Sequence, residues 1–219
     1  MTLLSIEALH VKLQSVDVLR GVNLLLRSGE MVGLLGRNGA GKTTTLRAVM
    51  GLVGSSAGRI SCAGQDLLAL PTHRRAGLGI GYMPEDRRLV PQLSVEENVL
   101  LPSWATGARD ADARLKYVYT LLPEVEAMRR RKPLALSGGQ QKLVALARAL
   151  NAGTRVLLLD EPFEGVAPAL SRRLAEVIGT LRGKEVGVLI AQSDLNYSAK
   201  LLDREYLLER GANVNVSTE

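Results

Sequence analysis

The sequence predicts an α/β fold, in which helices cover a mostly parallel sheet. After the first third of the chain, short apolar runs typical of buried strands alternate with segments of helical periodicity. The composition agrees, because 46% of the 219 residues are hydrophobic and 23% are charged, as in a folded domain with a sizeable core. No repeat or long linker interrupts the pattern, so we expect a single domain over residues 1–219.

In the N-terminal part, the pattern predicts short strands and then a helix after a glycine-rich loop. The strands fall within residues 3–35, and the last of them, Met31–Leu35, is a buried strand that follows the turn Ser28–Glu30. A helix is expected from about Lys42, with Gly51 as its C-terminal cap. Beyond it we expect a hairpin over residues 57–66 and a strand at Ile80–Met83.

The middle of the chain changes to helical periodicity, and we expect a small helical subdomain at about residues 90–135. Its polar break, Ala105–Arg114, separates two helical stretches. The next helix begins at Ser137, since Ser137 and Gln140 have the spacing of a capping box. The remaining elements are expected in the order strand Val156–Leu159, helix through Leu170–Leu181, and strand Val186–Ala191.

The basic composition, with a formal net charge of +6, bears on the surface and its partners. Basic residues cluster, above all in Arg129–Lys132, and we favour a solvated face over an anionic membrane surface or nucleic acid. An aromatic content of 3% argues against base stacking, so no nucleic-acid partner is expected. The single cysteine, Cys62, fits a reducing compartment, and neither a signal peptide nor a membrane-spanning run is expected.

The segment GRNGAGKT, Gly36–Thr43, has the spacing of a P-loop, which binds phosphates. Its glycines let backbone N–H groups approach phosphate oxygens, Lys42 would reach the β- and γ-phosphates, and the Thr43 hydroxyl would be a Mg²⁺ ligand. The pattern alone arises by chance, but here an apolar strand precedes it and a helix follows it. The nucleotide-binding residues that we expect from this segment are Gly36, Arg37, Asn38, Gly39, Ala40, Gly41, Lys42, Thr43 and Thr44.

The segment VLLLDEP, Val156–Pro162, is an apolar run followed by two acids. Asp160 and Glu161 would stand at the carboxyl end of a central strand, where parallel sheets place their ligands. We expect Asp160 to hold Mg²⁺, directly or through water, and Glu161 to be the general base for water that attacks the γ-phosphate. Two acids at a strand end are ordinarily solvated charges, but beside a P-loop catalysis is the better interpretation.

The segment LSGGQ, Leu136–Gln140, offers a second anion site at the N-terminal end, or mouth, of a helix. A capped helix would explain Ser137. It would not explain Gly138 and Gly139, because successive glycines weaken a helix start. One small domain would therefore carry two phosphate sites.

With these three motifs, the chain resembles the ATP-binding subunits of ATP-binding cassette (ABC) transporters over essentially its whole length. The resemblance implies a P-loop NTPase (RecA-like) core with an N-terminal antiparallel β-subdomain and a small helical subdomain, and ATP and Mg²⁺ as ligands. It also implies a head-to-tail pair of subunits, so the two phosphate sites are halves of two composite sites. The residues that would face the partner's γ-phosphate are Ser137, Gly138, Gly139 and Gln140.

Three positions depart from the common pattern of this family. Glu85 replaces a glutamine that reaches Mg²⁺ and the attacking water, and it could still ligate the metal. Gln192 replaces the switch histidine; it can hydrogen-bond the γ-phosphate or water but carries no proton charge. Leu13 stands where an aromatic ring ordinarily stacks on adenine, with Val18 nearby, so loose adenine selection is expected.

Two longer strings resemble the shorter ATPase of branched-chain amino-acid importers. Pro84–Pro102, which begins PEDRR and continues LSVEEN, is similar to PEGRR…LTVEEN, and EPFEGVAP, Glu161–Pro168, to EPSEGLAP. The resemblance implies a peripheral ATPase at the cytoplasmic face of the inner membrane, beneath two permease subunits fed by an external solute-binding protein. In that subfamily the partner ATPase is a different chain, and a second copy of this chain is the alternative.

Two other functions stay open at this point. A non-transport ABC ATPase of the iron–sulfur assembly type would copurify with soluble proteins rather than membrane proteins, whereas DNA-repair types carry long coiled-coil insertions that this sequence lacks. A weakly catalytic regulatory subunit is suggested by Glu85 and Gln192, and a steady-state ATPase assay discriminates it. The resemblance implies a branched-chain amino acid, another amino acid or a short amide as the solute.

Overall fold

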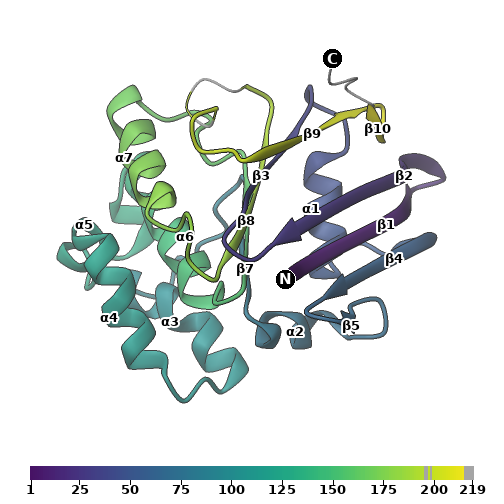
Figure 1. Cartoon of the computed structure of the whole chain (residues 1–219). Helices are drawn as coiled ribbons and strands as arrows, with labels where there is room; N and C mark the ends of the chain where they lie inside the picture. The colour runs from purple at the N-terminus through teal and green to yellow at the C-terminus, as the bar shows by residue number, and fades with distance from the viewer. Residues whose placement is uncertain (195–196, 198, 215–219) are drawn as a thin grey trace.

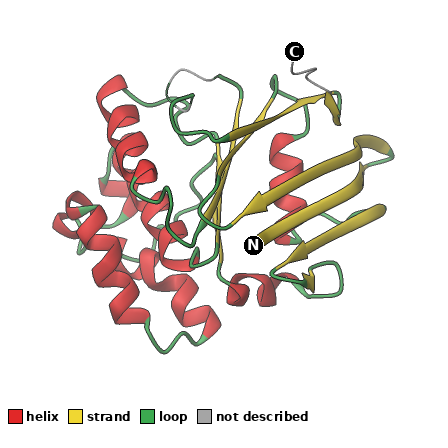
Figure 2. Ribbon diagram, viewed as in Figure 1, coloured by secondary structure: helices red, strands yellow, loops and turns green. Residues whose placement is uncertain are grey.

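Two β-sheets, with helices between and beside them, make up the chain, as a computed structural model of residues 1–194, 197 and 199–214 shows (Figures 1 and 2). The smaller sheet is antiparallel and has the order β2-β1-β4-β5, and the larger has the order β10-β9-β3-β8-β7-β6. The strands of the smaller sheet are β1 (Thr2–Leu13), β2 (Val16–Arg27), β4 (Ala57–Cys62) and β5 (Gln65–Asp66). Those of the larger sheet are β3 (Met31–Leu35), β6 (Ile80–Met83), β7 (Val156–Asp160), β8 (Gly187–Gln192), β9 (Arg204–Glu209) and β10 (Ala212–Val214).

The central strands of the larger sheet run parallel, and their carboxyl ends lie at one edge. Neighbours β3, β8, β7 and β6 are all paired in parallel register. Every residue of β3, β7 and β8 is buried, because both faces of this sheet are covered. The carboxyl ends of β3 and β7 therefore bring the loops that follow them, at residues 36 and 161, to the same side of the molecule.

Helix α1 (Lys42–Met50) separates the two sheets on one side of the larger sheet (Figure 1). Its apolar residues Leu46 and Val49 are fully buried in a core that also takes side chains from β1, β2, β3 and β8. Gly51 ends the helix in the left-handed conformation, as expected of its C-cap.

The other face of the larger sheet is covered by the remaining long helices (Figure 2). Helices α3 (Val95–Thr106), α4 (Ala111–Leu121) and α5 (Pro123–Ala127) form the helical region expected at about residues 90–135. The long helices are α6 (Gly138–Ala152) and α7 (Pro168–Gly179). Their apolar side chains share one buried core with strands β7 and β8 of the larger sheet. Short elements complete the chain: α2 (Thr72–Arg75) and the 3₁₀ turns η1 (Ala76–Leu78) and η2 (Pro133–Ala135).

Most of the predicted elements are confirmed, but the N-terminal strands are longer than expected. The helix from Lys42, the hairpin over residues 57–66 and the capping box at Ser137 are all present. Instead of several short strands, β1 and β2 are two continuous strands of 12 residues each. Irregularities in their pairing, including a shift around Ala8 (φ 43°), let the long ribbon bend without ending.

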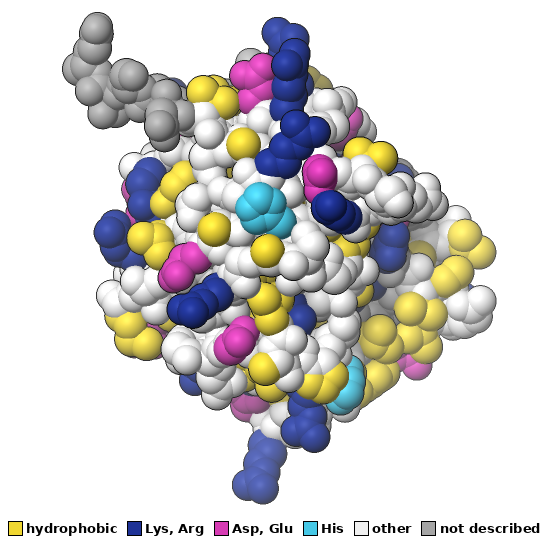
Figure 3. Space-filling view, turned by 90° about the vertical axis from the view of Figure 1, so that its right-hand side faces the viewer, with side chains coloured by type: hydrophobic (Ala, Val, Ile, Leu, Met, Phe, Trp, Pro, Cys, Tyr) yellow, Lys and Arg dark blue, Asp and Glu magenta, His cyan; other side chains and the backbone are white. Residues whose placement is uncertain are grey.

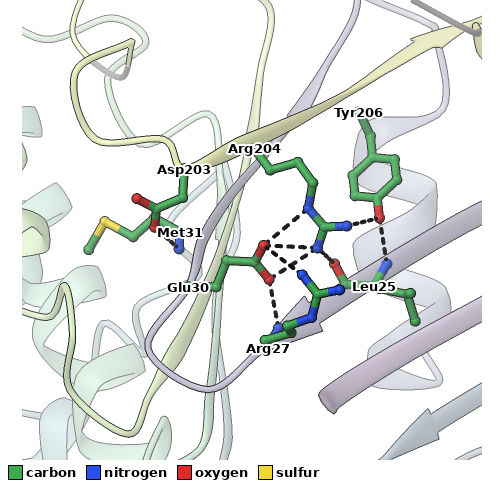
Figure 4. Close-up of polar contacts among 7 residues, drawn as sticks. All are labelled: Leu25, Arg27, Glu30, Met31, Asp203, Arg204 and Tyr206. Atoms are coloured by element: carbon green, nitrogen blue, oxygen red, sulfur yellow. Dashed lines mark hydrogen bonds and ion pairs between the residues drawn. The ribbon is translucent and has the colours of Figure 1, made fainter. Parts of the chain in front are cut away.

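The sequence interpretation did not anticipate strands β9 and β10, which extend the larger sheet beyond β3. Only Leu208 of β9 is buried, so the hydrophobic signal in this segment is weak. Polar contacts fix the strand instead (Figure 4). Glu30 accepts hydrogen bonds from Arg27 N at 2.8 Å and from Arg204 Nε and Nη2 at 3.1 and 3.0 Å, which ties the β2–β3 turn to β9.

The basic residues do not form a continuous patch on the face of the smaller sheet. Lys and Arg side chains are scattered there between acidic and apolar ones (Figure 3). Elsewhere Arg173 is paired with Glu124 at 2.7 Å, and Arg129 with Glu126 at 3.6 Å. These pairings favour the interpretation of a solvated surface. Among the residues that the structure describes, no helix combines the length and the apolar character needed to cross a membrane.

Candidate nucleotide site

The loop Gly36–Gly41 joins the carboxyl end of β3 to the start of α1, and its shape requires glycine at two positions. Gly36 has φ 158°, and a Cβ atom there would lie 2.3 Å from the carbonyl oxygen of Leu208. Gly41, the N-cap of α1, has φ 108°, and its Cβ would lie 2.6 Å from Leu19 Cδ2. No side chain caps the helix, so its first backbone N–H groups stay available for an anion.

An open pocket of about 360 Å³ lies at this helix mouth. It brings together most of the residues expected from the P-loop, and three acids from other parts of the chain reach it, Glu85, Glu161 and Glu164. Val18, expected near adenine, is also in its wall. Its full lining is Val18, Asn38, Gly39, Gly41, Lys42, Thr43, Thr44, Glu85, Glu161 and Glu164.

The other expected nucleotide residues lie beside this pocket rather than in it. Gly36, Arg37 and Ala40 line a separate pocket of about 470 Å³ against β9. Leu13 lies at the end of β1, is 40% exposed and lines neither pocket. Val18 is thus the better placed of the two residues expected near adenine.

Lys42 is almost fully buried, with 5% of its surface exposed, and is held by several oxygen atoms. Its Nζ lies 3.1 Å from Glu161 Oε1 and donates to Gly36 O at 2.7 Å and Ser193 Oγ at 2.9 Å. The ammonium therefore points into a ring of acceptors of the kind that phosphate oxygens would supply.

Asp160 and Thr43 meet at the carboxyl end of β7. Thr43 Oγ1 donates to Asp160 Oδ1 at 3.0 Å, and the Tyr82 hydroxyl donates to Asp160 Oδ2 at 3.2 Å. Asp160 is completely buried, and this burial raises its pKa from 3.8 to about 6, although both hydrogen bonds act in the opposite direction. Ionisation of a buried carboxylate costs free energy, and a nearby cation offsets that cost.

These oxygen atoms fit Mg²⁺ in the way that phosphate-binding enzymes use it. The described residues contain no cluster of three or more His, Cys, Asp or Glu side chains that could hold a metal by themselves. Mg²⁺ commonly needs only one or two protein oxygens, with water and phosphate completing the octahedron. The Thr43 hydroxyl and the Asp160 carboxylate, 3.0 Å apart, supply such a pair.

Glu161 directly follows Asp160 and has a left-handed backbone, with φ 45°. That conformation is uncommon for a residue with a side chain, and such positions cluster at functional sites. Its carboxylate is 7% exposed and is oriented by Ser193, whose hydroxyl lies 2.5 Å from Oε1 and whose backbone N–H donates to Oε2 at 3.2 Å.

Ser193 is a site residue that the sequence interpretation missed. Its single hydroxyl has three close neighbours, Lys42 Nζ, Glu161 Oε1 and Asn38 Oδ1 at 2.7 Å, so it links the P-loop to the acid after β7. The available signal was its position directly after Gln192, at the carboxyl end of another central strand.

Gln192 is 4% exposed and lies beside Glu161 and Ser193 in the wall of a further pocket of about 210 Å³. Its side-chain oxygen Oε1 is buried and has no hydrogen-bond partner among the described residues. An orphaned buried acceptor carries a cost, so this oxygen is poised to accept from water or another donor.

The LSGGQ segment is placed apart from the P-loop. Ser137 caps α6 through the predicted capping box, with Gln140 N donating to Ser137 Oγ at 3.2 Å. Gly138 lines a pocket of about 260 Å³ that contains no P-loop residue. The structure also supplies a packing reason for Gly139, since a Cβ there would lie 2.6 Å from Leu170 Cδ2.

The P-loop pocket and the pocket at Gly138, where the sequence predicts two anion sites, share acidic side chains. Glu85 and Glu164 line both the P-loop pocket and the pocket at Gly138. Both residues are exposed on the surface between the two sites. A phosphate held at the P-loop of this chain would meet these two carboxylates before it reached the mouth of α6 of the same chain.

Comparison with protein families and curated proteins shows which proteins this chain resembles. Residues 19–164 match the family model described as ABC transporter. The lipopolysaccharide export system ATP-binding protein LptB of Haemophilus influenzae is 37% identical over 220 residues, covering 100% of this chain and 91% of that protein. The high-affinity branched-chain amino acid transport ATP-binding protein BraG of Pseudomonas aeruginosa is 34% identical over 209 residues, covering 95% and 90%.

Solved structures agree as well. One described as the ATP binding subunit of an ABC transporter superposes with a TM-score of 0.85 at 29% identity. The match covers 96% of this chain and 88% of the solved one. The arrangement of two sheets and flanking helices is therefore shared with an ATP-binding protein over nearly the whole chain.

Proposed function

We infer the function of this chain from one premise, that it belongs to the ABC transporter family of ATP-binding proteins. The family hydrolyses ATP and couples the reaction to transport. We take residues 1–219 as one ATP-binding domain of an importer, peripheral to the membrane. One observation supports the assignment of ATP hydrolysis to particular residues: Lys42, Asp160 and Glu161 converge at one pocket.

The chain's own residues divide the chemistry among them. Backbone N–H groups at the start of α1 and the Lys42 ammonium bind the phosphates. Phosphate oxygens at Lys42 compete with the Lys42–Glu161 ion pair of 3.1 Å, so nucleotide binding releases the Glu161 carboxylate to accept a proton from water. Gln192 Oε1 accepts from the same water or a donor beside it. Thr43 and Asp160 would hold Mg²⁺, which would supply charge neutralisation at the phosphates.

A pair of subunits explains the second anion site. Because Glu85 and Glu164 stand between the P-loop pocket and Gly138, one phosphate cannot use both sites of one chain. Head-to-tail pairing places the start of α6 against the γ-phosphate held by the partner and removes the conflict. ATP binding then closes the pair, hydrolysis reopens it, and the helical region α3–α5 passes the movement to two permease subunits.

Amino-acid import is the transport process that we favour. The strings PEDRR and EPFEGVAP support it, and BraG, an amino-acid transport protein by name, is 34% identical. Mg²⁺ as cofactor, a different ATPase as partner and an external solute-binding protein belong to the same proposal. A second candidate is an export system, because LptB, named for lipopolysaccharide export, is 37% identical.

Purification of the tagged chain from detergent-solubilised membranes tests the proposal. We expect a second ATPase and two permeases to copurify, and after reconstitution into liposomes a branched-chain amino acid with its binding protein should raise ATP turnover at least several-fold. Copurification with an envelope lipid exporter, and turnover that responds to lipopolysaccharide instead, would support export. An intact complex without any ATP turnover would overturn the enzymatic assignment.

A further inference from the structure

Lys142, on the second turn of α6, is buried without a carboxylate partner. Its exposed fraction is 5%, and no acidic oxygen of the described residues lies within ion-pair distance of its ammonium. Instead, Nζ donates to the backbone carbonyl oxygen of Glu161 at 2.8 Å and of Glu164 at 2.5 Å. Burial lowers the pKa of Lys142, and the charges of Glu164, Glu161 and Glu85 act in the opposite direction.

The two carbonyl groups that Lys142 binds are the ends of the tight turn after β7. Glu164 N donates to Glu161 O at 3.2 Å and closes this turn. Glu161, with its left-handed backbone, begins the turn and directs its carboxylate toward Lys42 and Ser193. A donor on the Glu161 carbonyl fixes the plane of the peptide that follows, and hence the direction from which the carboxylate enters the nucleotide pocket.

The same lysine is fixed to the mouth of α6. Gly138 is four residues before Lys142, so the two positions lie on one face of the helix, and both line the pocket of about 260 Å³. The first turn of α6 is held by the Ser137 capping box and packs through Gly139 against Leu170 of α7. Lys142 therefore links the N-terminal end of α6 to the turn that carries Glu161.

We propose that Lys142 is a positioning residue that couples the mouth of α6, where the partner's nucleotide binds, to the Glu161 carboxylate at the chain's own nucleotide. This inference rests on the proposed function in a paired ATPase. A hydrocarbon side chain of similar length would fill the space without desolvating an ammonium, but it would bind neither carbonyl group. The coupling is a property of the two N–H···O bonds rather than of the packing.

The test compares Lys142→Met, which keeps the length and removes the donors, with Lys142→Gln, which keeps an amide donor. Lys116→Met, at an exposed position on α4, is the matched control. All are measured in the complex with the copurified partner subunits. We expect Lys142→Met to bind a fluorescent ATP analogue within about twofold of wild type and to form the ATP-closed pair. Its kcat should fall at least tenfold with KM within about twofold, and Lys142→Gln should recover at least part of the loss.

Three outcomes separate the possibilities. Unchanged kcat in Lys142→Met, with an active wild-type complex, overturns the inference and leaves the proposed function intact. The second outcome for Lys142→Met is a lower melting temperature and fewer nucleotide-binding sites, with an unchanged kcat per binding site. That result would show that Lys142 has only a structural role, and it would also overturn the inference. No turnover in the wild-type complex contradicts the proposed function itself.

Discussion

The buried acid Asp160, a proposed Mg²⁺ ligand, illustrates at the scale of one residue how a buried charge weakens the fold around it. Its carboxylate is completely buried, and its pKa is raised from 3.8 to about 6 by that burial. A raised pKa in the folded state means that the acid contributes stability while it is protonated. That contribution is complete below about pH 3.8 and is lost as the pH rises through about 6.

We predict that Asp160→Asn stabilises the chain at pH 8 and not at pH 3.5. The difference between 3.8 and about 6 corresponds to a cost of roughly 3 kcal/mol for the ionised acid at high pH, and the uncharged amide avoids most of it. Urea unfolding with EDTA and without nucleotide, at both pH values, measures the effect. An equal change in unfolding free energy at the two pH values would mean that charge burial at this site is not the cause.

A second prediction at this scale concerns Glu161. Glu161→Gln keeps the shape and the contact with Ser193 N, but the amide cannot accept a proton. ATP turnover should fall by about 10²–10⁴-fold, while ATP binding persists and the closed pair accumulates. Steady-state phosphate release and size-exclusion chromatography with ATP measure the two properties. If turnover stays at the wild-type rate, the base lies elsewhere, and Glu85, which also lines the pocket, is the next candidate.

At the scale of elements, strands with a strong apolar signal were predictable and strands fixed by polar contacts were not. The continuous apolar runs of β3, β7 and β8 follow from burial on both faces of the sheet, and their ends located the P-loop and the two acids. Strand β9 has one buried residue, Leu208, and its place depends on partners about 175 residues earlier in the chain. Such long-range polar pairing leaves no local pattern in the sequence.

The Glu30 network therefore gives a prediction at the element scale. Glu30→Ala removes the acceptor for Arg27 N and Arg204 and should destabilise the fold by about 2–3 kcal/mol, because charge-assisted bonds at a nearly buried acid are lost. Amide hydrogen exchange should show the loss of protection concentrated in β9. The matched control is Glu7→Ala, since Glu7 is exposed. Loss of protection spread evenly over both sheets would contradict a local role in fixing β9.

At the scale of the whole molecule, the site splits into a part that the sequence located and a part that needs a partner. The P-loop, Asp160 and Glu161 converge within one chain as their spacing predicts, but Ser193 joins them only through the parallel pairing of β3 with β8. The function of LSGGQ could not be predicted from spacing, because the residues that share the pocket of Gly138 include Arg87, Glu85 and Glu164 but no P-loop residue. The start of a helix predicted an anion there, and only the resemblance to a paired family assigned that anion to the partner's nucleotide.

The last prediction tests that pairing at Gly138. Arg87 Nη1 would lie 3.1 Å from a Cβ atom at this position, and its flexible side chain can move, so both Gly138→Ala and Gly138→Asp should fold. Each variant should bind ATP in the isolated chain with wild-type affinity, since the P-loop pocket does not contain Gly138. Gly138→Asp should nonetheless lose ATP-driven pairing and hydrolysis, because a carboxylate at the mouth of α6 repels the partner's γ-phosphate. Gly138→Ala, which adds bulk without charge, should retain more activity than Gly138→Asp.

Mixing Gly138→Asp chains with Lys42→Ala chains then shows whether the natural partner is a second copy of this chain. In a pair of identical chains, both lesions fall in one composite site and the other site recovers, whereas with a different natural partner the mixture stays inactive. Full hydrolysis by Gly138→Asp alone would show that the start of α6 does not bind the partner's γ-phosphate.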